Sequence, residues 1–183
     1  MERAHLERAA VRHSRLRGLL LVPAGLLCIV AALANEQILP VWSLPAAVAV
    51  AATVCLAMAR HYRERYGSVS PSGRQEAREL AAVAAAIVLM IGGAVLLRDL
   101  PVNPVAVAFA LGMVVGYATG PGLETHHQVI WGALLVAGAV PVWDGADSSN
   151  AGLILAGVAV IANGLLDHHA FLHTFGPPGD ARA

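Results

Sequence analysis

The sequence predicts an all-α membrane protein with six transmembrane helices, arranged as three helical hairpins with both termini in the cytoplasm. Composition is the first reason, because 57% of the 183 residues are hydrophobic and only 13% are charged, whereas soluble domains carry about 25% charged residues. A soluble fold of this length could not bury so much apolar surface, so lipid must solvate most of the chain. The formal net charge of +0 provides no basic surface field, and we therefore expect no nucleic-acid partner.

Six apolar runs are the second reason, since about 20 helical residues, and at least about 17, are needed to cross the hydrocarbon core. Several runs are shorter than this and reach the required length only if a turn of the flanking residues is also helical. The fifth could instead be re-entrant, which would leave five crossings. The runs are 18–34, 41–59, 80–97, 104–120, 129–143 and 151–166. They predict a transmembrane domain over 18–174, between a basic N-terminal flank (1–17) and a C-terminal tail (175–183).

The distribution of arginine is the third reason, and it predicts the orientation. Every Arg except Arg98 lies in the N-terminal flank, in the loop 60–79 or in the tail, and the sequence contains no Lys. Positively charged loops stay on the cytoplasmic side of the membrane, so these three segments are predicted to be cytoplasmic. We therefore expect a multi-pass protein of the bacterial cytoplasmic (inner) membrane, whose immediate partner is the lipid bilayer.

The cytoplasmic loop 60–79 is the longest polar segment of the chain. Its residues 72–75, S-G-R-Q, fit a capping box, which predicts that the third helix begins in the cytoplasm and runs into the membrane. The Tyr and Arg side chains of this loop suit the lipid headgroup zone. They could equally form a docking surface for a cytoplasmic protein partner.

The fourth run carries Gly112, Gly116 and Gly120 at four-residue spacing. Stripes of small residues at this spacing let helices approach closely in lipid, so we interpret the three as packing residues, within the bundle or at the seam of a homo-oligomer. Tyr117 and Asn163 are among the few polar side chains at membrane depth. A polar group is costly in hydrocarbon unless it finds a partner, so both are expected in the bundle interior.

All eight histidines fall on the predicted cytoplasmic side. Two histidine clusters stand out: residues 124–127 (E-T-H-H), just before the fifth run, and residues 167–173 (D-H-H-A-F-L-H), at the end of the sixth. The fifth and sixth runs are predicted to form an antiparallel hairpin. The start of one and the end of the other should then lie at the same membrane depth.

A metal ion such as zinc or iron could be held between these clusters by Glu124, His127, His169 and His173, with Asp167 as a further ligand or as support for one. His169 and His173 are four residues apart, which places both rings on one helix face. Two other interpretations stay open: an interface held by hydrogen bonds, and a pH sensor. The zinc-protease motif H-E-x-x-H is absent, so the spacing is not specific for one metal.

Two short motifs resemble those of small multi-pass bacterial inner-membrane proteins of unassigned function. They are Y-x-x-x-Y-G-x-V-x-P-S at 62–72 and G-L-L-D-H at 164–168. The resemblance implies a shared membrane topology and no activity.

The function that these observations favour is that of a non-catalytic sensor or accessory subunit, acting through a His/Arg-rich cytoplasmic face. One alternative is a small transporter or substrate-binding membrane subunit. The other is a metal-binding membrane protein or enzyme with a His/Glu site on its cytoplasmic face. No catalytic triad and no phosphate-binding loop motif is found, so no catalytic residue is predicted.

Overall fold

The computed structural model describes residues 18–66, 73–119, 122–141 and 148–175, and over these ranges it is entirely helical. A short 3-10 turn, η1 (Gly18–Leu20), precedes six α-helices, and the described residues form no strand. The helices are α2 (Val22–Asn35), α3 (Ser43–Tyr66), α4 (Gly73–Leu96), α5 (Pro104–Thr119), α6 (Thr125–Ala139) and α7 (Ser148–Phe175). The predicted all-α class is confirmed. The basic flank 1–17, the loop residues 67–72, Gly120 and the tail from 176 onward lie outside the described residues.

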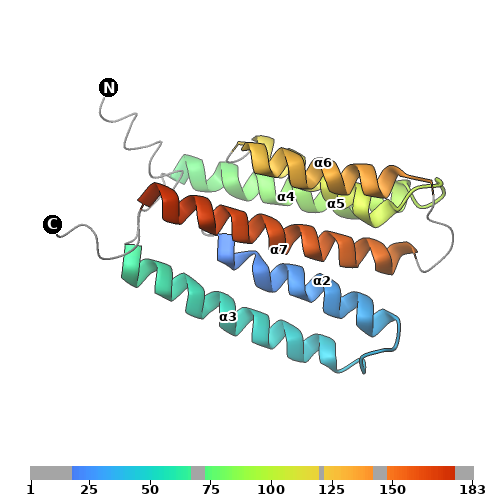
Figure 1. The fold of residues 1–183 in the computed structure, drawn as a ribbon, viewed down its shortest axis with the longest axis horizontal. Helices are drawn as coiled ribbons and strands as arrows, with labels where there is room; N and C mark the ends of the chain where they lie inside the picture. The colour runs from blue at the N-terminus through green and yellow to red at the C-terminus, as the bar shows by residue number, and fades with distance from the viewer. Residues whose placement is uncertain (1–17, 67–72, 120–121, 142–147, 176–183) are drawn as a thin grey trace.

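The six helices run side by side along the long axis of the molecule and alternate in direction (Figure 1). The consecutive pairs α2–α3, α4–α5 and α6–α7 are in contact. Helix α7 packs against α2, α5 and α6, whereas α3 packs mainly on α2 and α4 mainly on α5. Helix α7 is therefore the centre of the bundle, and α3 and α4 are its outer helices.

Glycine lets η1 and α2 approach α7 until the backbones touch. A Cβ atom on Gly157 would lie 2.6 Å from the carbonyl oxygen of Gly25, and a Cβ atom on Gly164 would lie 2.5 Å from that of Gly18. Any larger residue at these positions would push the two helices apart. The contact sets the position of α7, the helix that carries the second histidine cluster.

The predicted glycine stripe of the fourth run lies on α5 and faces α4. A Cβ atom on Gly112 would lie 2.8 Å from the carbonyl oxygen of Ala86, and one on Gly116 would lie 3.2 Å from the Ala86 side chain. The third member of the stripe, Gly120, is outside the described residues. The two described glycines therefore lie at a contact within the bundle.

Three helical segments are long and apolar enough to cross a membrane: 18–35, 43–65 and 148–174. The other apolar segments, 80–96 and 104–119, are shorter; a 16-residue helix rises about 24 Å, less than the ~30 Å of the hydrocarbon core. Six crossings were predicted, and three of the helices meet the criteria for one. Helix α4 is long, but only its part 80–96 is apolar, and α5 and α6 have 16 and 15 residues.

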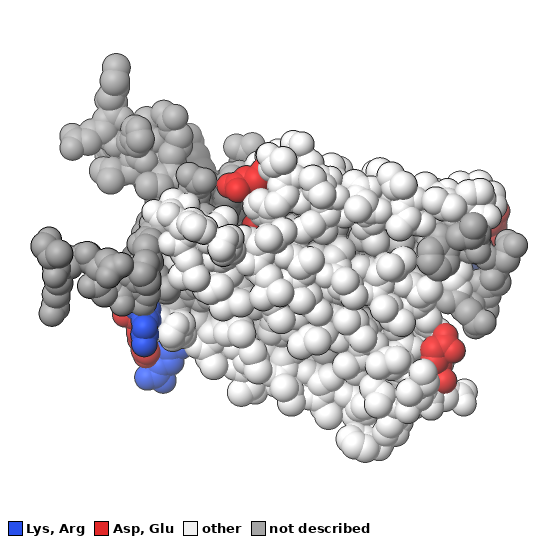
Figure 2. Space-filling model, viewed as in Figure 1, with Lys and Arg blue, Asp and Glu red and all other residues white. Residues whose placement is uncertain are grey.

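The described surface fits lipid along most of its length. Charged side chains lie toward the two ends of the bundle, and the broad face between them carries none (Figure 2). Large apolar side chains on this surface are exposed, among them Leu56 at 73% and Val88 at 69%. Exposed apolar surface of this extent is rare on soluble monomers and normal for helices in a bilayer.

At the end opposite the histidines, Asn103 joins three helices. It is 0% exposed, its Oδ1 accepts the backbone N–H of Ala106 (2.9 Å) and its Nδ2 donates to the carbonyl oxygen of Ser148. Its own backbone N–H donates to the carbonyl oxygen of Gly138 (2.8 Å). Its side chain thus caps the start of α5 and ties it to the start of α7, and its backbone N–H ties it to the end of α6.

Candidate functional site

Asp167 is the one buried carboxylate among the described residues, with 2% of its surface exposed. It lies on α7, two turns before the end of that helix, at the histidine-rich end of the bundle. A buried ionised carboxylate is strongly unfavourable unless hydrogen bonds or opposite charges compensate it. The partners of Asp167 therefore define the site.

Four side chains from α5, α6 and α7 surround this carboxylate. Oδ1 of Asp167 lies 2.8 Å from Nε2 of His126 and 2.9 Å from Nε2 of His127. Oδ2 accepts from Nδ2 of Asn163 (2.9 Å) and from the hydroxyl of Tyr117 (3.4 Å). We call these five residues the Asp167 cluster. It satisfies both oxygens of the acid and joins three helices at one buried point.

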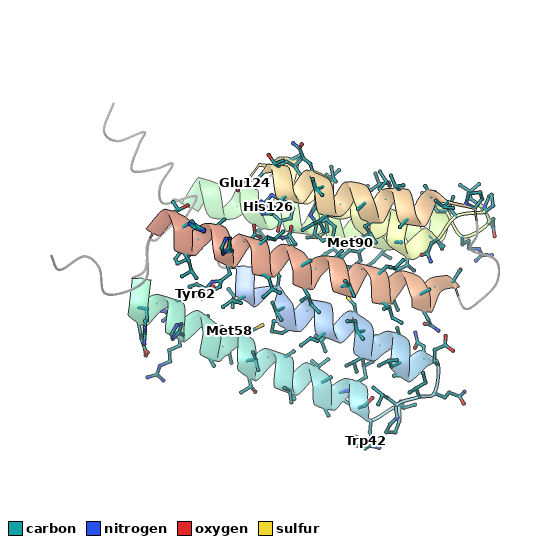
Figure 3. All side chains as sticks on the ribbon, in the orientation of Figure 1. Trp42, Met58, Tyr62, Met90, Glu124 and His126 are labelled. Carbon is teal, nitrogen blue, oxygen red and sulfur yellow. The ribbon has the colours of Figure 1, made fainter. Side chains whose placement is uncertain are left out.

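The rings of the cluster are also packed against one another. The Tyr117 and His127 rings stack with centroids 4.0 Å apart, and the His126 and His127 rings lie 4.1 Å apart. Figure 3 places His126 at the beginning of α6, beside α7. The stacking holds both imidazole rings with their Nε2 atoms toward Asp167.

The N-terminal cap of α6 determines which nitrogen of His127 carries the proton. Glu124 is the N-cap residue of a capping box, in which Nδ1 of His127 accepts the backbone N–H of Glu124 at 3.0 Å. A backbone N–H can only donate, so Nδ1 is the unprotonated nitrogen of the neutral ring. Nε2 of His127 therefore carries the proton and donates a hydrogen bond to Asp167.

Three members of the cluster could hold a metal ion. The ligand atoms of His126, His127 and Asp167 all lie within 4.8 Å of one another. Two imidazoles and one carboxylate form the protein ligand set of many zinc and non-haem iron sites. The Glu124 carboxylate lies 3.8 Å from Nδ1 of His126, on the side where an acid commonly orients a metal-bound histidine.

The structure brings together only part of the predicted metal set. His127 and Asp167 are in direct contact and Glu124 lies beside them, whereas His169 and His173 hydrogen-bond to each other at 3.1 Å and belong to no three-ligand group in the described chain. Asp167 and His169 are two residues apart, which is about 200° around a helix axis. Their side chains therefore leave α7 on opposite sides.

His126 is the cluster member that the sequence analysis did not select. Adjacent helical residues usually point about 100° apart, so one histidine of the pair was expected to face away. In the first turn of α6 both rings nevertheless reach one carboxylate oxygen. The available signal was the H-H pair itself, opposite an acid at the same membrane depth.

The predicted interior polar residues both lie in the cluster. Asn163 is 0% exposed and Nδ2 donates to the Tyr117 hydroxyl oxygen at 2.7 Å. Oδ1 of Asn163 is buried and accepts no hydrogen bond from the described residues. The site thus has one unused acceptor next to Asp167.

A second contact, which the sequence analysis missed, joins α3 to α7 beside the cluster. Tyr62 is 1% exposed, its hydroxyl lies 2.8 Å from Nδ1 of His168, and its ring meets Phe171 edge-on with centroids 5.6 Å apart. His168 directly follows Asp167, so the position of α3 is tied to the helix that carries the buried acid.

Comparisons of the chain with known protein families, with curated proteins and with solved structures found no match. The resemblance of the two short motifs to bacterial inner-membrane proteins therefore stays a prediction. Function is inferred below from the Asp167 cluster and the surface of the bundle.

Proposed function

We propose that this protein is a multi-pass integral membrane protein that binds one divalent transition-metal ion, of the zinc or iron class, at His126, His127 and Asp167. It acts without catalysis, as a metal-dependent sensor or accessory subunit. The observation that carries the proposal is the convergence of three ligand atoms from α6 and α7 at one buried point. Such a point is rare in an apolar bundle, where intramembrane ionisable residues usually serve a function.

Free-energy magnitudes favour the metal over hydrogen bonds alone. Coordination through Nε2 of His126 and His127 replaces their hydrogen bonds to Asp167, and at His127 it also moves the proton to Nδ1 and breaks the hydrogen bond from the Glu124 backbone N–H. These three hydrogen bonds together contribute about 4–7 kcal/mol, since a bond to a charged group contributes about 1.5–3 kcal/mol and an ordinary bond about 1 kcal/mol, whereas a structural zinc ion contributes about 10–16 kcal/mol in small zinc-binding peptides at pH 7. The free energy gained by metal binding is therefore larger than the free energy lost with the broken hydrogen bonds. The unused Oδ1 of Asn163 supplies an acceptor for a metal-bound water.

The proposed output is the position of α6. Its first turn supplies two ligands and α7 supplies the third, so the ion holds the start of α6 against α7. Tyr117 extends the effect to α5, and the contact between Tyr62 and His168 extends it to α3. A cytoplasmic protein partner that binds this end of the bundle would then distinguish the metal-bound from the metal-free state.

The proposed setting is the bacterial cytoplasmic membrane, with six helices in the bilayer and both termini in the cytoplasm. The alternating helix directions (Figure 1) and the arginine-poor opposite end support it. The groove between α2 and α3 is lined by apolar side chains alone. A groove of this kind suits a lipid chain better than a polar substrate, so it does not favour transport.

The proposal is tested by metal analysis of the full-length protein, purified in detergent without a histidine tag and without chelators. We expect a stoichiometric amount of zinc or iron in the wild type and its loss in Asp167→Asn and in His126→Ala. His61→Ala, which removes an exposed histidine of α3, is the matched control and should retain the metal. Equal metal in the wild type and Asp167→Asn, or none in either after incubation with Zn²⁺ or Fe²⁺, would overturn the proposal.

Hydrogen exchange tests the output. Metal should slow amide exchange at residues 122–127 in the wild type, because the ion anchors the first turn of α6. Asp167→Asn should show the same exchange with and without metal. If the wild type binds metal without a change in exchange at these residues, the metal site stands and the sensor role is refuted.

A further inference from the structure

His169 and His173 form a pair of exposed rings on the last two turns of α7. Their Nε2 atoms lie 3.1 Å apart, and the ring planes are inclined at 83° with centroids 4.4 Å apart. The neighbouring His168 is engaged with α3 through its hydrogen bond to Tyr62. The pair is therefore accessible and separate from both buried contacts.

The spacing of the two nitrogens matches the bite of a metal chelate. Metal–imidazole bonds of about 2.0–2.1 Å to nitrogens 3.1 Å apart enclose an angle of about 100°. That value lies between the right angle of square-planar or octahedral ions and the tetrahedral angle. Neutral imidazoles bind Cu²⁺, Ni²⁺ and Zn²⁺, with Cu²⁺ the tightest of the divalent series.

We infer that His169 and His173 form a second, solvent-facing site for a divalent transition-metal ion, with Cu²⁺ bound most tightly and water in the remaining positions. The inference does not rest on the proposed function, because neither ligand belongs to the Asp167 cluster. A site with two protein ligands holds its ion less tightly than a buried site with three. It suits rapid capture and release at the end of the bundle where the Asp167 cluster lies.

The test uses Cu²⁺ as the probe on full-length, tag-free protein in detergent, in the His126→Ala background that removes the proposed buried site. Calorimetric titration should give one binding event, and electron paramagnetic resonance should show nitrogen coordination. His169→Ala and His173→Ala should each weaken binding by at least about tenfold, which corresponds to about 1.4 kcal/mol. His61→Ala should leave the affinity unchanged. Unchanged affinity in both single variants would overturn the inference.

A spacing control separates geometry from histidine content. The double variant His173→Ala/Thr174→His keeps two histidines but places them five residues apart, so the second ring turns by about 100° around the helix. It should bind Cu²⁺ as weakly as His173→Ala. Binding at the original strength would show adventitious binding to histidines and would refute the chelate.

The two proposed metal sites can be tested independently of each other. Asp167→Asn alone should keep the Cu²⁺ event, and its loss there would show that His169 and His173 are not an independent site. Conversely, the double variant His169→Ala/His173→Ala should keep the zinc or iron of the Asp167 cluster. A negative result at one site therefore leaves the other proposal standing.

Discussion

Nε2 of His127 lies 2.9 Å from Oδ1 of Asp167, and both side chains are almost completely buried. The contact joins the first turn of α6 to α7, forty residues farther along the chain. Because the N-cap of α6 leaves the proton on Nε2, this hydrogen bond has a defined direction in the metal-free protein. Any change at Asp167 must therefore affect the packing of α6 as well as metal binding.

Removal of the Asp167 carboxylate should strongly destabilise the protein even without metal. Asp167→Ala leaves the N–H donors of His126 and His127 without their acceptor, and each buried donor left unsatisfied costs about 1–3 kcal/mol. We expect a loss of that size in the free energy of unfolding, measured by denaturant titration in detergent with a chelator present. Asp99→Asn, at an exposed acid, is the control and should change stability little. A loss as small as that of the control would contradict the assigned network.

The glycine contact between α2 and α7 predicts opposite effects for two glycine substitutions. Gly157→Ala introduces a Cβ atom 2.6 Å from the carbonyl oxygen of Gly25, and we expect destabilisation of about 1–3 kcal/mol from overpacking. Gly132→Ala on α6 meets no atom within 4 Å, and it should be neutral or stabilising by about 0.5–1 kcal/mol, as for alanine in an open helix position. Thermal unfolding of both variants in the same detergent measures the difference. Equal stability would mean that α2 and α7 do not touch as described.

Substitution of Asn103 should loosen the end of the bundle that lacks histidines. Asn103→Ala removes the cap of α5 and the bond to Ser148, and loss of a helix cap alone costs about 0.5–2 kcal/mol. Asn103→Asp keeps the acceptor for Ala106 but places a buried carboxylate oxygen against the carbonyl oxygen of Ser148, so it should be at least as destabilising as alanine. Gly152→Ala should resemble Asn103→Ala, because a Cβ atom there would clash with Oδ1 of Asn103. Asn35→Ala, at an exposed amide, is the matched control; chemical denaturation that ranks it with Asn103→Ala would refute the assignment.

The docking of α3 should depend more on the ring of Tyr62 than on its hydroxyl. Tyr62→Phe keeps the contact with Phe171 and loses one hydrogen bond, worth about 0.5–1.5 kcal/mol. Tyr62→Ala empties a fully buried site, and aromatic-to-alanine changes cost about 3–5 kcal/mol. Limited proteolysis between α3 and α4 should be unchanged or slightly faster in Tyr62→Phe and much faster in Tyr62→Ala. Similar cleavage of Tyr62→Ala and the wild type would show that this contact does not hold α3.

The sequence by itself determined the properties that depend on local composition. The apolar runs predicted helices, and the low charge predicted a lipid-facing surface, because the solvent preference of a segment follows from its own side chains. The antiparallel order of the last two runs also predicted that Glu124, His127 and Asp167 would lie near one another. Register along a bundle axis follows from helix length and chain direction, both of which can be estimated from the chain alone.

Only the tertiary structure decided which faces of the helices meet. The rotation of α7 about its axis is set by the contacts of Gly25 with Gly157 and of Gly18 with Gly164, and it turns Asp167 inward and the pair at 169 and 173 outward. The hydropathy pattern does not determine that rotation. The buried site therefore contains His126, which was not predicted, and lacks His169 and His173, which were predicted. The three-helix contact of Asn103 was hidden for the same reason, since its partners are backbone groups from distant segments. Close backbone contacts, which few residues permit, thus determined the identity of the buried site.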